Sequence, residues 1–326
     1  MQHSFKHKQL LSSLLLAAPL LVGIQSPAQA ESLSNKLLLT GGVSQVEGAA
    51  GGGLTPWAVI GGYGTNNEIG ANMHYTYAPT DDFKLQTYGV TVGFYDRFEF
   101  SVAEQKFDIG NLRNKVSKGL GADVIGRDEL SQTIVGAKLR ILGEAVLDAD
   151  TWMPQVAVGV QYKKNHDGDF IKSAVIGAKR DSGVDFYIAA TKLLLDQNLL
   201  LNATLRATKA NQLGLLGFGG SRNDNYRPEL ELSAAYLLDK KLAVGAEYRM
   251  KPDNLKSPAN AALFGGANVV DLKEDDAFDL FVAYAPTKNV SLTAAYVYLG
   301  NIATVAPVGA DYGKQSAIYL SAQVGF

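Results

Sequence analysis

The stretch Ser316 to Phe326, Ser-Ala-Ile-Tyr-Leu-Ser-Ala-Gln-Val-Gly-Phe, decides the fold class of this chain. Its residues alternate between apolar and polar, as in a β-strand with two different faces. The apolar face comprises Ile318, Leu320, Ala322, Val324 and Phe326. Chain ends usually fray into solvent unless a specific interaction holds them. The pattern therefore predicts a strand that is built into a sheet up to its last residue.

A closing strand of this kind resembles the final strand of Gram-negative outer-membrane β-barrels. In those proteins an aromatic last residue, preceded by alternating apolar positions, serves as the assembly signal. The resemblance implies that Phe326 is the assembly signal and that the barrel assembly machinery is a partner. The alternative is an ordinary sheet strand that happens to finish the chain.

The first thirty residues have the features of a secretory signal peptide. Lys6 and Lys8 make a basic start, Leu10 to Ile24 is an apolar core, and Ala28 and Ala30 form a small-residue cleavage site. The apolar run is too short for a membrane anchor and no cluster of charges follows it. We predict that residues 1–30 are removed and that the mature protein comprises residues 31–326.

Composition excludes several classes of protein. The formal net charge of −2 becomes −4 without Lys6 and Lys8, so no basic surface for nucleic acid is expected. The sequence contains no cysteine, which rules out disulfides and thiolate chemistry. The uncharged runs Gly48–Asn67 and Asn289–Ala310 contain Gly, Pro and Asn, and are poor candidates for membrane helices. A closed β-barrel can still span a bilayer, because its strands satisfy one another's backbone groups.

Segments of about ten residues with alternating polarity fill the mature chain. Leu199–Thr208 shows the pattern well, since Leu201, Ala203 and Leu205 oppose Asn202, Thr204 and Arg206. The predicted strands are Leu37–Val46, Trp57–Gly64, Ile69–Ala78, Phe83–Phe94, Phe98–Phe107, Ser131–Leu142, Met153–Lys164, Val184–Leu195, Leu199–Thr208, Glu229–Leu238, Leu242–Lys251, Phe278–Ala285, Val290–Leu299 and Ser316–Phe326.

The connections between these segments alternate between short and long almost throughout, with the short connection Pro79–Asp82 as the exception. Short turns and long loops at opposite ends are typical of outer-membrane barrels, in which the long loops are extracellular. The sequence therefore predicts an all-β, transmembrane, antiparallel up-and-down barrel of 12 to 14 strands. The range in the count comes from residues 31–64, which allow three interpretations: a lumen plug, a periplasmic segment or the first two strands. Within them, the Gly-rich stretch Glu47–Pro56 is either a hinge or constriction loop folded into the lumen, or a loop in solvent.

Charged residues on the polar sides of the segments are the best candidates for a functional site. A charge that faces lipid at the middle of the bilayer costs about 2 to 4 kcal/mol, so each should point into the lumen. Mixed signs allow either an aqueous channel that selects small polar solutes or a salt-bridged, non-conducting interior. The lumen-lining candidates are Lys138, Arg140, Lys163, Arg206, Glu229, Glu231, Glu247 and Arg249.

Residues for catalysis or metal binding are scarce. The mature chain has two histidines, His74 and His166, and neither has the Ser-His pairing that an outer-membrane hydrolase needs. His74 is expected on the lumen wall and His166 in a loop. Gly217-Phe218-Gly219-Gly220 is not followed by a helix pattern, so we interpret it as a flexible external loop instead of a phosphate site. We predict no enzyme activity, no metal and no cofactor.

Several stretches resemble the Gram-negative outer-membrane proteins of the family known as domain of unknown function 3034. The resemblance spans most of the mature chain and implies a barrel in the outer membrane, but it supplies no substrate and no catalytic residue. The stretches that carry it are residues 40–48 with 56–58 (TGGVSQVEG and PWA), 154–162 (PQVAVGVQY), 202–208 (NATLRAT), and 245–249 followed by 252–254 (GAEYR and PDN).

The sequence as a whole predicts an exported, porin-like barrel in the cell outer membrane that passes small solutes through a polar lumen. Outer-membrane lipid would be its surroundings and small solutes its ligands. The alternative is a non-conducting structural or adhesive barrel that acts through its long extracellular loops.

Overall fold

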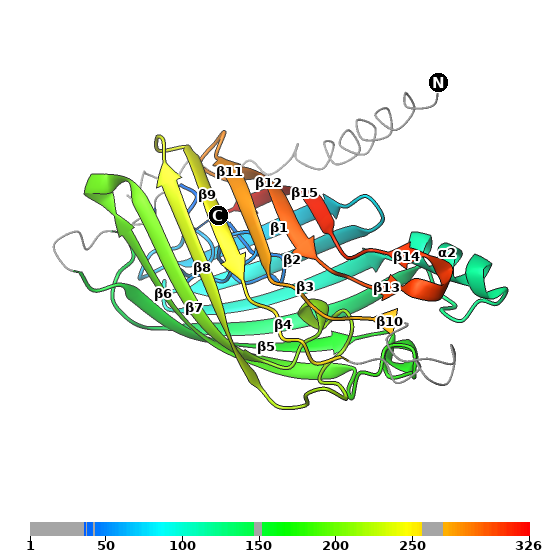
Figure 1. Cartoon of the computed structure of the whole chain (residues 1–326). Coiled ribbons are helices and arrows are strands. Elements are labelled where there is room, and N and C mark those ends of the chain that lie inside the picture. Colours follow the sequence, from blue (N-terminus) through cyan, green and yellow to red (C-terminus); the bar gives the residue numbers. More distant parts are fainter. Residues whose placement is uncertain (1–35, 37, 42, 147–151, 256–269) are drawn as a thin grey trace, which may run out of the picture. The chain divides into compact units, whose positions relative to one another are not determined.

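The computed structural model describes residues 36, 38–41, 43–146, 152–255 and 270–326. Within these residues, twelve antiparallel strands form a closed barrel, in which each strand pairs with its neighbours in the chain and β1 pairs with β15 (Figure 1). This confirms the predicted up-and-down topology and sets the strand count at twelve. No helix of the described residues is long and apolar enough to cross a membrane.

Most barrel strands contain about eleven residues, enough to cross a bilayer at the tilt of a barrel. The twelve barrel strands are β1 (Ile69–Pro79), β2 (Lys84–Phe94), β3 (Phe98–Asp108), β4 (Glu129–Leu142), β5 (Gln155–Asn165), β6 (Ser182–Leu194), β7 (Leu199–Thr208), β8 (Arg227–Leu237), β9 (Leu242–Arg249), β11 (Ala277–Tyr284), β12 (Val290–Gly300) and β15 (Gln315–Gly325).

The alternation of the sequence becomes the inside and outside of the barrel. In β11, burial alternates strictly, so that Phe278, Leu280 and Val282 lie outside while Asp279 and Phe281 lie inside. Leu280 is 63% exposed on this outer surface, whereas Asp279 is 2% exposed. An apolar outer face and a polar inner face suit a barrel that is surrounded by lipid.

The two ends of the barrel differ in their connections. At the end that we call the turn end, short links join β2 to β3, β6 to β7, β8 to β9 and β11 to β12, and Phe326 lies beside β1. At the other end, which we call the loop end, the connections are long, except for the short link between β1 and β2.

The loop end is folded and has an apolar core of its own. A cluster that includes Phe83, Phe107, Phe170 and Ile171 ties the loops together. Sequence periodicity predicted none of the helices here, because they are short and lie within loops. The elements of this end are α2 (Gly110–Leu120), α3 (Gly168–Ile171), the 3-10 helices η3 (Gln212–Gly214) and η4 (Ala306–Val308), and a small sheet of β10 (Val270–Asp271), β13 (Thr304–Val305) and β14 (Ala310–Asp311).

The loop Gly217–Gly220 was expected to be a flexible external loop, and the structure corrects this. Phe218 is 1% exposed, and its backbone amide and carbonyl exchange hydrogen bonds with Arg180. The phenyl ring lies against Gly183 at the start of β6, where a Cβ atom would come within 2.3 Å of the ring.

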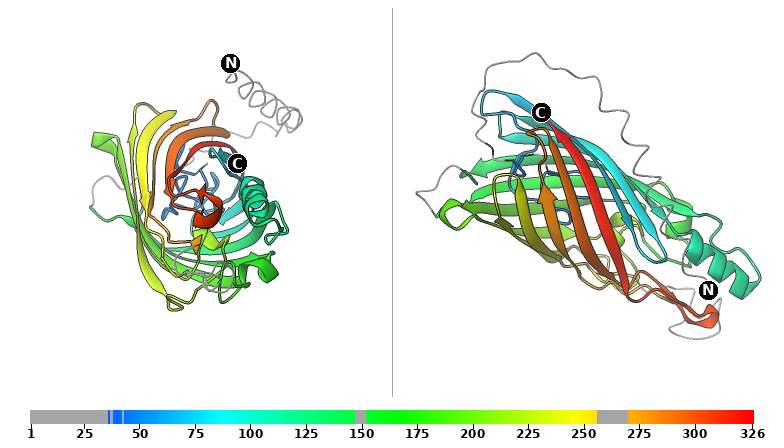
Figure 2. Two further views of the ribbon diagram at one scale, coloured as in Figure 1. Left: turned by 45° about the vertical axis from the view of Figure 1, so that its right-hand side comes forward. Right: turned by 90° about the horizontal axis from the view of Figure 1, so that it is seen from above.

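Residues 38–41 and 43–64, which we call the luminal segment, lie inside the barrel. The ring of strands surrounds the segment in the view along the barrel (Figure 2). The described residues of the expected strands Leu37–Val46 and Trp57–Gly64 form turns and bends, with isolated bridges from Ser44 to Ala50 and from Gly51 to Pro56. They do not become strands because their backbone groups bond to side chains of the barrel wall instead of to a neighbouring strand.

Candidate functional site

The luminal segment is bound by polar side chains from all sides of the barrel. For example, Thr204 donates to the carbonyl of Pro56 at 2.8 Å, and the backbone amide of Ser44 donates to Gln323 at 2.8 Å. These hydroxyls and amides replace the partners that a strand would supply to buried backbone groups. Wall side chains that bond the segment's backbone in this way include Thr87, Thr91, Gln105, Gln155, Thr191, Thr204 and Gln323.

Lys138 on β4 holds the middle of the segment. Its ammonium group donates to the carbonyls of Ala50, Trp57 and Val59 at 2.6 to 3.1 Å. Its counter-ion is Glu99 of β3, at 3.0 Å, and both side chains are 1% exposed. The carboxylate of Glu99 accepts hydrogen bonds from two more amides of the segment. The wall therefore supplies both charges at this place, which we call the Lys138 site.

Glu247 on β9 binds the Gly-rich turn of the segment. Its carboxylate accepts hydrogen bonds from the backbone amide of Leu54, the hydroxyl of Thr55 and the hydroxyl of Ser233. A Cβ atom on Gly52 would come within 2.0 Å of the Glu247 carboxylate. Only glycine fits at this position without moving the carboxylate.

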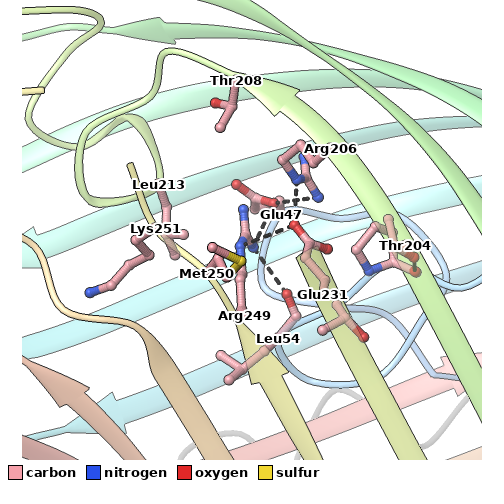
Figure 3. A network of polar contacts seen from close by, with 12 residues as sticks. Glu47, Leu54, Thr204, Arg206, Thr208, Leu213, Glu231, Arg249, Met250 and Lys251 are labelled. Atoms are coloured by element: carbon pink, nitrogen blue, oxygen red, sulfur yellow. Dashed lines mark hydrogen bonds and ion pairs between the residues drawn. The ribbon is translucent and has the colours of Figure 1, made fainter. Parts of the chain in front are cut away.

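Glu47 is the centre of a second and larger site. Its carboxylate forms ion pairs with Lys163 of β5, with Arg206 of β7 at 3.5 Å and with Arg249 of β9 at 3.0 Å. Gly48, at φ 95°, allows the tight turn that presents Glu47 to the wall. All four side chains are at most 4% exposed. Figure 3 shows Glu47 between the guanidinium groups of Arg206 and Arg249.

Two wall carboxylates complete this site, which we call the Glu47 network. Glu231 accepts from Arg206 at 2.5 Å and lies 3.4 Å from Arg249. Asp185 lies 2.7 Å from Lys163 and 3.4 Å from Arg206. The network thus contains the cations Lys163, Arg206 and Arg249 and the carboxylates Glu47, Asp185 and Glu231, so its formal charges cancel.

The loop end covers the Glu47 network. The carbonyl of Leu213, in η3, accepts from Lys163 at 3.2 Å and from Gln132 at 3.2 Å. Gln212 and Leu213 both have positive φ angles, 44° and 62°, which residues other than glycine seldom adopt. The strained turn is held in place because its groups bond to the barrel wall and to the next loops.

The other charged candidates from the sequence lie elsewhere on the inner side. Arg140 is at the turn end, where it pairs with Asp96 at 2.8 Å and with Glu144 at 3.0 Å. Glu229 is buried at the loop end of β8, with no ion pair among those found for the described residues. Glu47, Glu99 and Asp185 were not among the sequence candidates. Periodicity could have found Glu99, since it alternates with Phe98 and Phe100 on the polar side of β3.

Little free space remains between the segment and the wall. One cavity of about 30 Å³ lies beside Leu39, Val43 and Trp57, and another of about 80 Å³ lies beside Val46, Leu54 and Leu213. Ligand pockets usually measure about 300 to 1,000 Å³. Both cavities are too small for a permeating solute, and both are lined mainly by apolar side chains.

A buried carboxylic acid lies beyond the strands at the loop end. Glu274, between β10 and β11, accepts from the backbone amide of Gln212 at 2.9 Å. Burial raises the pKa of Glu274 to about 8, although the positive charge of Lys251 opposes this shift. The ammonium group of Lys251 donates to the carbonyl of Leu299 at 2.9 Å and also to Gln212. These contacts link the ends of β9 and β12 with the loops above the lumen.

Neither histidine is a member of the Glu47 network. His74 is buried on the inner side of β1, and neither ring nitrogen has a hydrogen-bond partner among the described residues. His166 contacts Thr133 at 2.8 Å on a partly exposed loop, and the neighbouring Asp167 is engaged by Arg127 and by the backbone amide of Ser131.

The carbonyl of Phe326 accepts from the backbone amides of Tyr63 and Ala71 at the turn end. Its role as an assembly signal remains a prediction. The predicted signal peptide, with Ala28 and Ala30, lies outside the described residues.

Comparison with known proteins gives a family and a set of similar folds. No curated protein sequence matches this chain significantly. An outer-membrane channel from Pseudomonas putida F1 is 14% identical, with a TM-score of 0.46 over 84% of this chain and 97% of that chain. The KdgM porin is 11% identical, with a TM-score of 0.44 over 78% of this chain and 99% of that one.

Outer membrane phospholipase A from Escherichia coli, an enzyme on a barrel, is 11% identical, with a TM-score of 0.37 over 82% of this chain and 98% of that one. At these identities the similarity is one of fold only. Residues 40–323 match the family described as protein of unknown function DUF3034, as the sequence resemblance implied. The chain therefore belongs to the DUF3034 family, and its described residues form a closed, twelve-stranded antiparallel β-barrel.

Proposed function

We propose that this protein is an outer-membrane channel for small polar solutes and that its own luminal segment closes it. The observation that carries the proposal is the polarity of the inner wall. Buried hydroxyl, amide and charged side chains line it behind the segment, including Thr91, Gln105, Gln161, Asn202, Thr204 and Ser233. A wall that only had to enclose a permanent core would be better stabilised by apolar side chains.

The same wall is suited to water. Each hydroxyl or amide that now bonds the segment can bond a water molecule when the segment leaves, so no buried polar group has to remain unsatisfied. Polar interiors of this kind are found in the water-filled lumens of porins. The segment is joined to β1 by a short link, residues 65–68, which leaves it covalently attached in both states.

A reversible lock tests this function. Thr55 of the segment and Ser233 of β8 approach within 2.5 Å through their side-chain oxygens, so cysteines at both positions can form a disulfide. The sequence has no cysteine of its own that could interfere. We expect Thr55→Cys/Ser233→Cys to be silent in planar bilayers when oxidised and to show discrete openings after reduction.

The matched control places a disulfide in the barrel wall alone. Thr76 of β1 and Ser321 of β15 face each other in register, 2.8 Å apart through their side-chain oxygens. We expect Thr76→Cys/Ser321→Cys to conduct like the wild type in both redox states. A wild-type protein that inserts but never conducts would contradict the channel, and equal conductance of the oxidised lock and its control would contradict closure by the segment.

A further inference from the structure

The wall side of the Glu47 network lacks one negative charge. Without Glu47, only Asp185 and Glu231 form ion pairs with Lys163, Arg206 and Arg249 among the described residues. Glu229, the register partner of Arg206 on β8, is buried nearby but forms no ion pair among these residues. A buried charge that loses its partner is strongly destabilising. An occupant that brings one negative charge would therefore restore the charge balance that Glu47 provides.

The carboxylate of Glu47 satisfies this place only in part, because Oε1 accepts a hydrogen bond from Lys163 while Oε2 has ion-pair contacts alone. Its Oε2 atom is near both arginines but has no aligned hydrogen bond, and Nη2 of Arg206 has no hydrogen-bond partner among the described residues. Nε2 of Gln161, on β5, is likewise buried without a partner. The side chains of Arg206 and Gln161 are also joined by a hydrogen bond of 2.7 Å, so these two donors belong to one site.

Guanidinium groups recognise carboxylates through paired N–H donors. A free carboxylate, which has no tether to the backbone, can align with these groups in a way that Glu47 does not. A dianion would overcompensate the single missing charge. The geometry points to a binding site for small monocarboxylate solutes formed by Lys163, Arg206 and Arg249, in which Glu47 is a tethered occupant that such a solute replaces.

This inference rests on the proposed function, because a solute reaches the site only when the luminal segment moves. It adds the chemical class of the solute. The site itself can be tested without any channel activity, since removal of the Glu47 side chain leaves a space for a small carboxylate within the full-length protein.

Chemical rescue of Glu47→Ala is the test. Both this variant and its control carry Trp152→Phe, so that Trp57 of the segment is the one remaining tryptophan and reports unfolding. We expect sodium formate and acetate to stabilise Glu47→Ala. At about ten times its dissociation constant, formate should raise the folding constant about tenfold. Formamide, acetamide and sodium chloride at matched concentrations should not.

Glu247→Ala is the matched control. Glu247 is a buried wall carboxylate that binds the same segment, but through neutral donors and without an ion pair among the described residues. We expect no rescue of this variant by formate. Equal rescue of both variants, or none of Glu47→Ala, would overturn the carboxylate site.

Folding yield provides the same comparison if Glu47→Ala does not fold unaided. More folded protein in formate than in formamide supports the site, and equal yields overturn it. Conductance separates the two hypotheses. Rescue by formate together with a silent wild-type channel would overturn the proposed function and leave the site, whereas conduction without rescue would overturn the site and leave the channel.

Discussion

The Lys138 site and the Glu47 network hold the same segment against the same wall, but the charges have different origins. At the Lys138 site the wall supplies both the cation and its partner Glu99, and the segment contributes neutral carbonyls and amides. In the Glu47 network the segment supplies one of the charges itself. The first site stays neutral when the segment leaves, and the second does not. Two sites that are equally buried can therefore differ in their net charge once the luminal segment leaves.

The largest effect is expected from breaking the Glu47 network. Glu47→Gln and Arg249→Met each leave an unpaired buried charge, so each should lower the free energy of unfolding by about 3 to 5 kcal/mol. The double variant removes one charge of each sign and should be more stable than either single variant. Urea unfolding in detergent micelles, followed by Trp57 emission with all variants carrying Trp152→Phe, measures the coupling. Additive losses would show that the two residues do not share a site.

A smaller coupling is expected at the Lys138 site. Lys138→Met and Glu99→Gln should each destabilise, and the double variant restores neutrality. It still leaves the carbonyls of Trp57 and Val59 without the donor Lys138, at about 1 to 3 kcal/mol for each buried group, whereas the carbonyl of Ala50 keeps the backbone amide of Trp57. Recovery in this double variant should therefore be less complete than in Glu47→Gln/Arg249→Met. A full recovery would mean that charge alone matters at both sites, and the comparison would fail.

The smallest effect is expected at Glu274, whose carboxyl is not balanced by three cations as the carboxylate of Glu47 is. Its folded-state pKa of about 8 lies above the ordinary value of 4.5, so between these values the folded state binds one proton more. Stability from this group is fully present below pH 4.5 and is lost as the pH rises through 8, with a slope of at most about 1.4 kcal/mol per pH unit.

Glu274→Gln should remove this part of the pH dependence. The charged groups that act on Glu274 are Lys251, Asp253 and Glu229, and they remain in the variant. Unfolding curves of the wild type and the variant between about pH 4 and about pH 9, a range that brackets the window from 4.5 to about 8, test this. Parallel curves for the two proteins would contradict the assignment.

Periodicity predicted the barrel well because each strand has two chemically different environments. The alternation in β7 and β15 specified which side chains face outward, and the twelve strands from Ile69 onward lie close to the predicted ranges. The inward direction of Arg206 follows from the same rule. The ion-pair partners of Arg206 do not follow from this rule. Alternation predicts which face of the sheet a side chain lies on, but not its height along the barrel, and the partners Glu231 and Asp185 lie on different strands.

The luminal segment could not be placed from sequence for a different reason. Gly51, Gly52 and Gly53 have no side chains, so the stretch has no period that would favour a strand, a helix or a loop. Its conformation is set by contacts with β3, β4, β8 and β9, which exist only in the folded barrel. Glu47 therefore showed no sign in the sequence of being the residue around which three cations gather.

The contacts of the luminal segment also bear on the order of folding. Its hydrogen bonds to β3 join residues 38 and 49 positions apart, whereas the bond from Ser44 to Gln323 joins residues 279 positions apart. Contacts between distant parts of a chain carry a larger loop-closure entropy and slow folding. The segment can make its first contacts with an open sheet, but it completes them only after the last strand has paired with the first. The full set of contacts between the segment and the wall therefore exists only in the closed barrel.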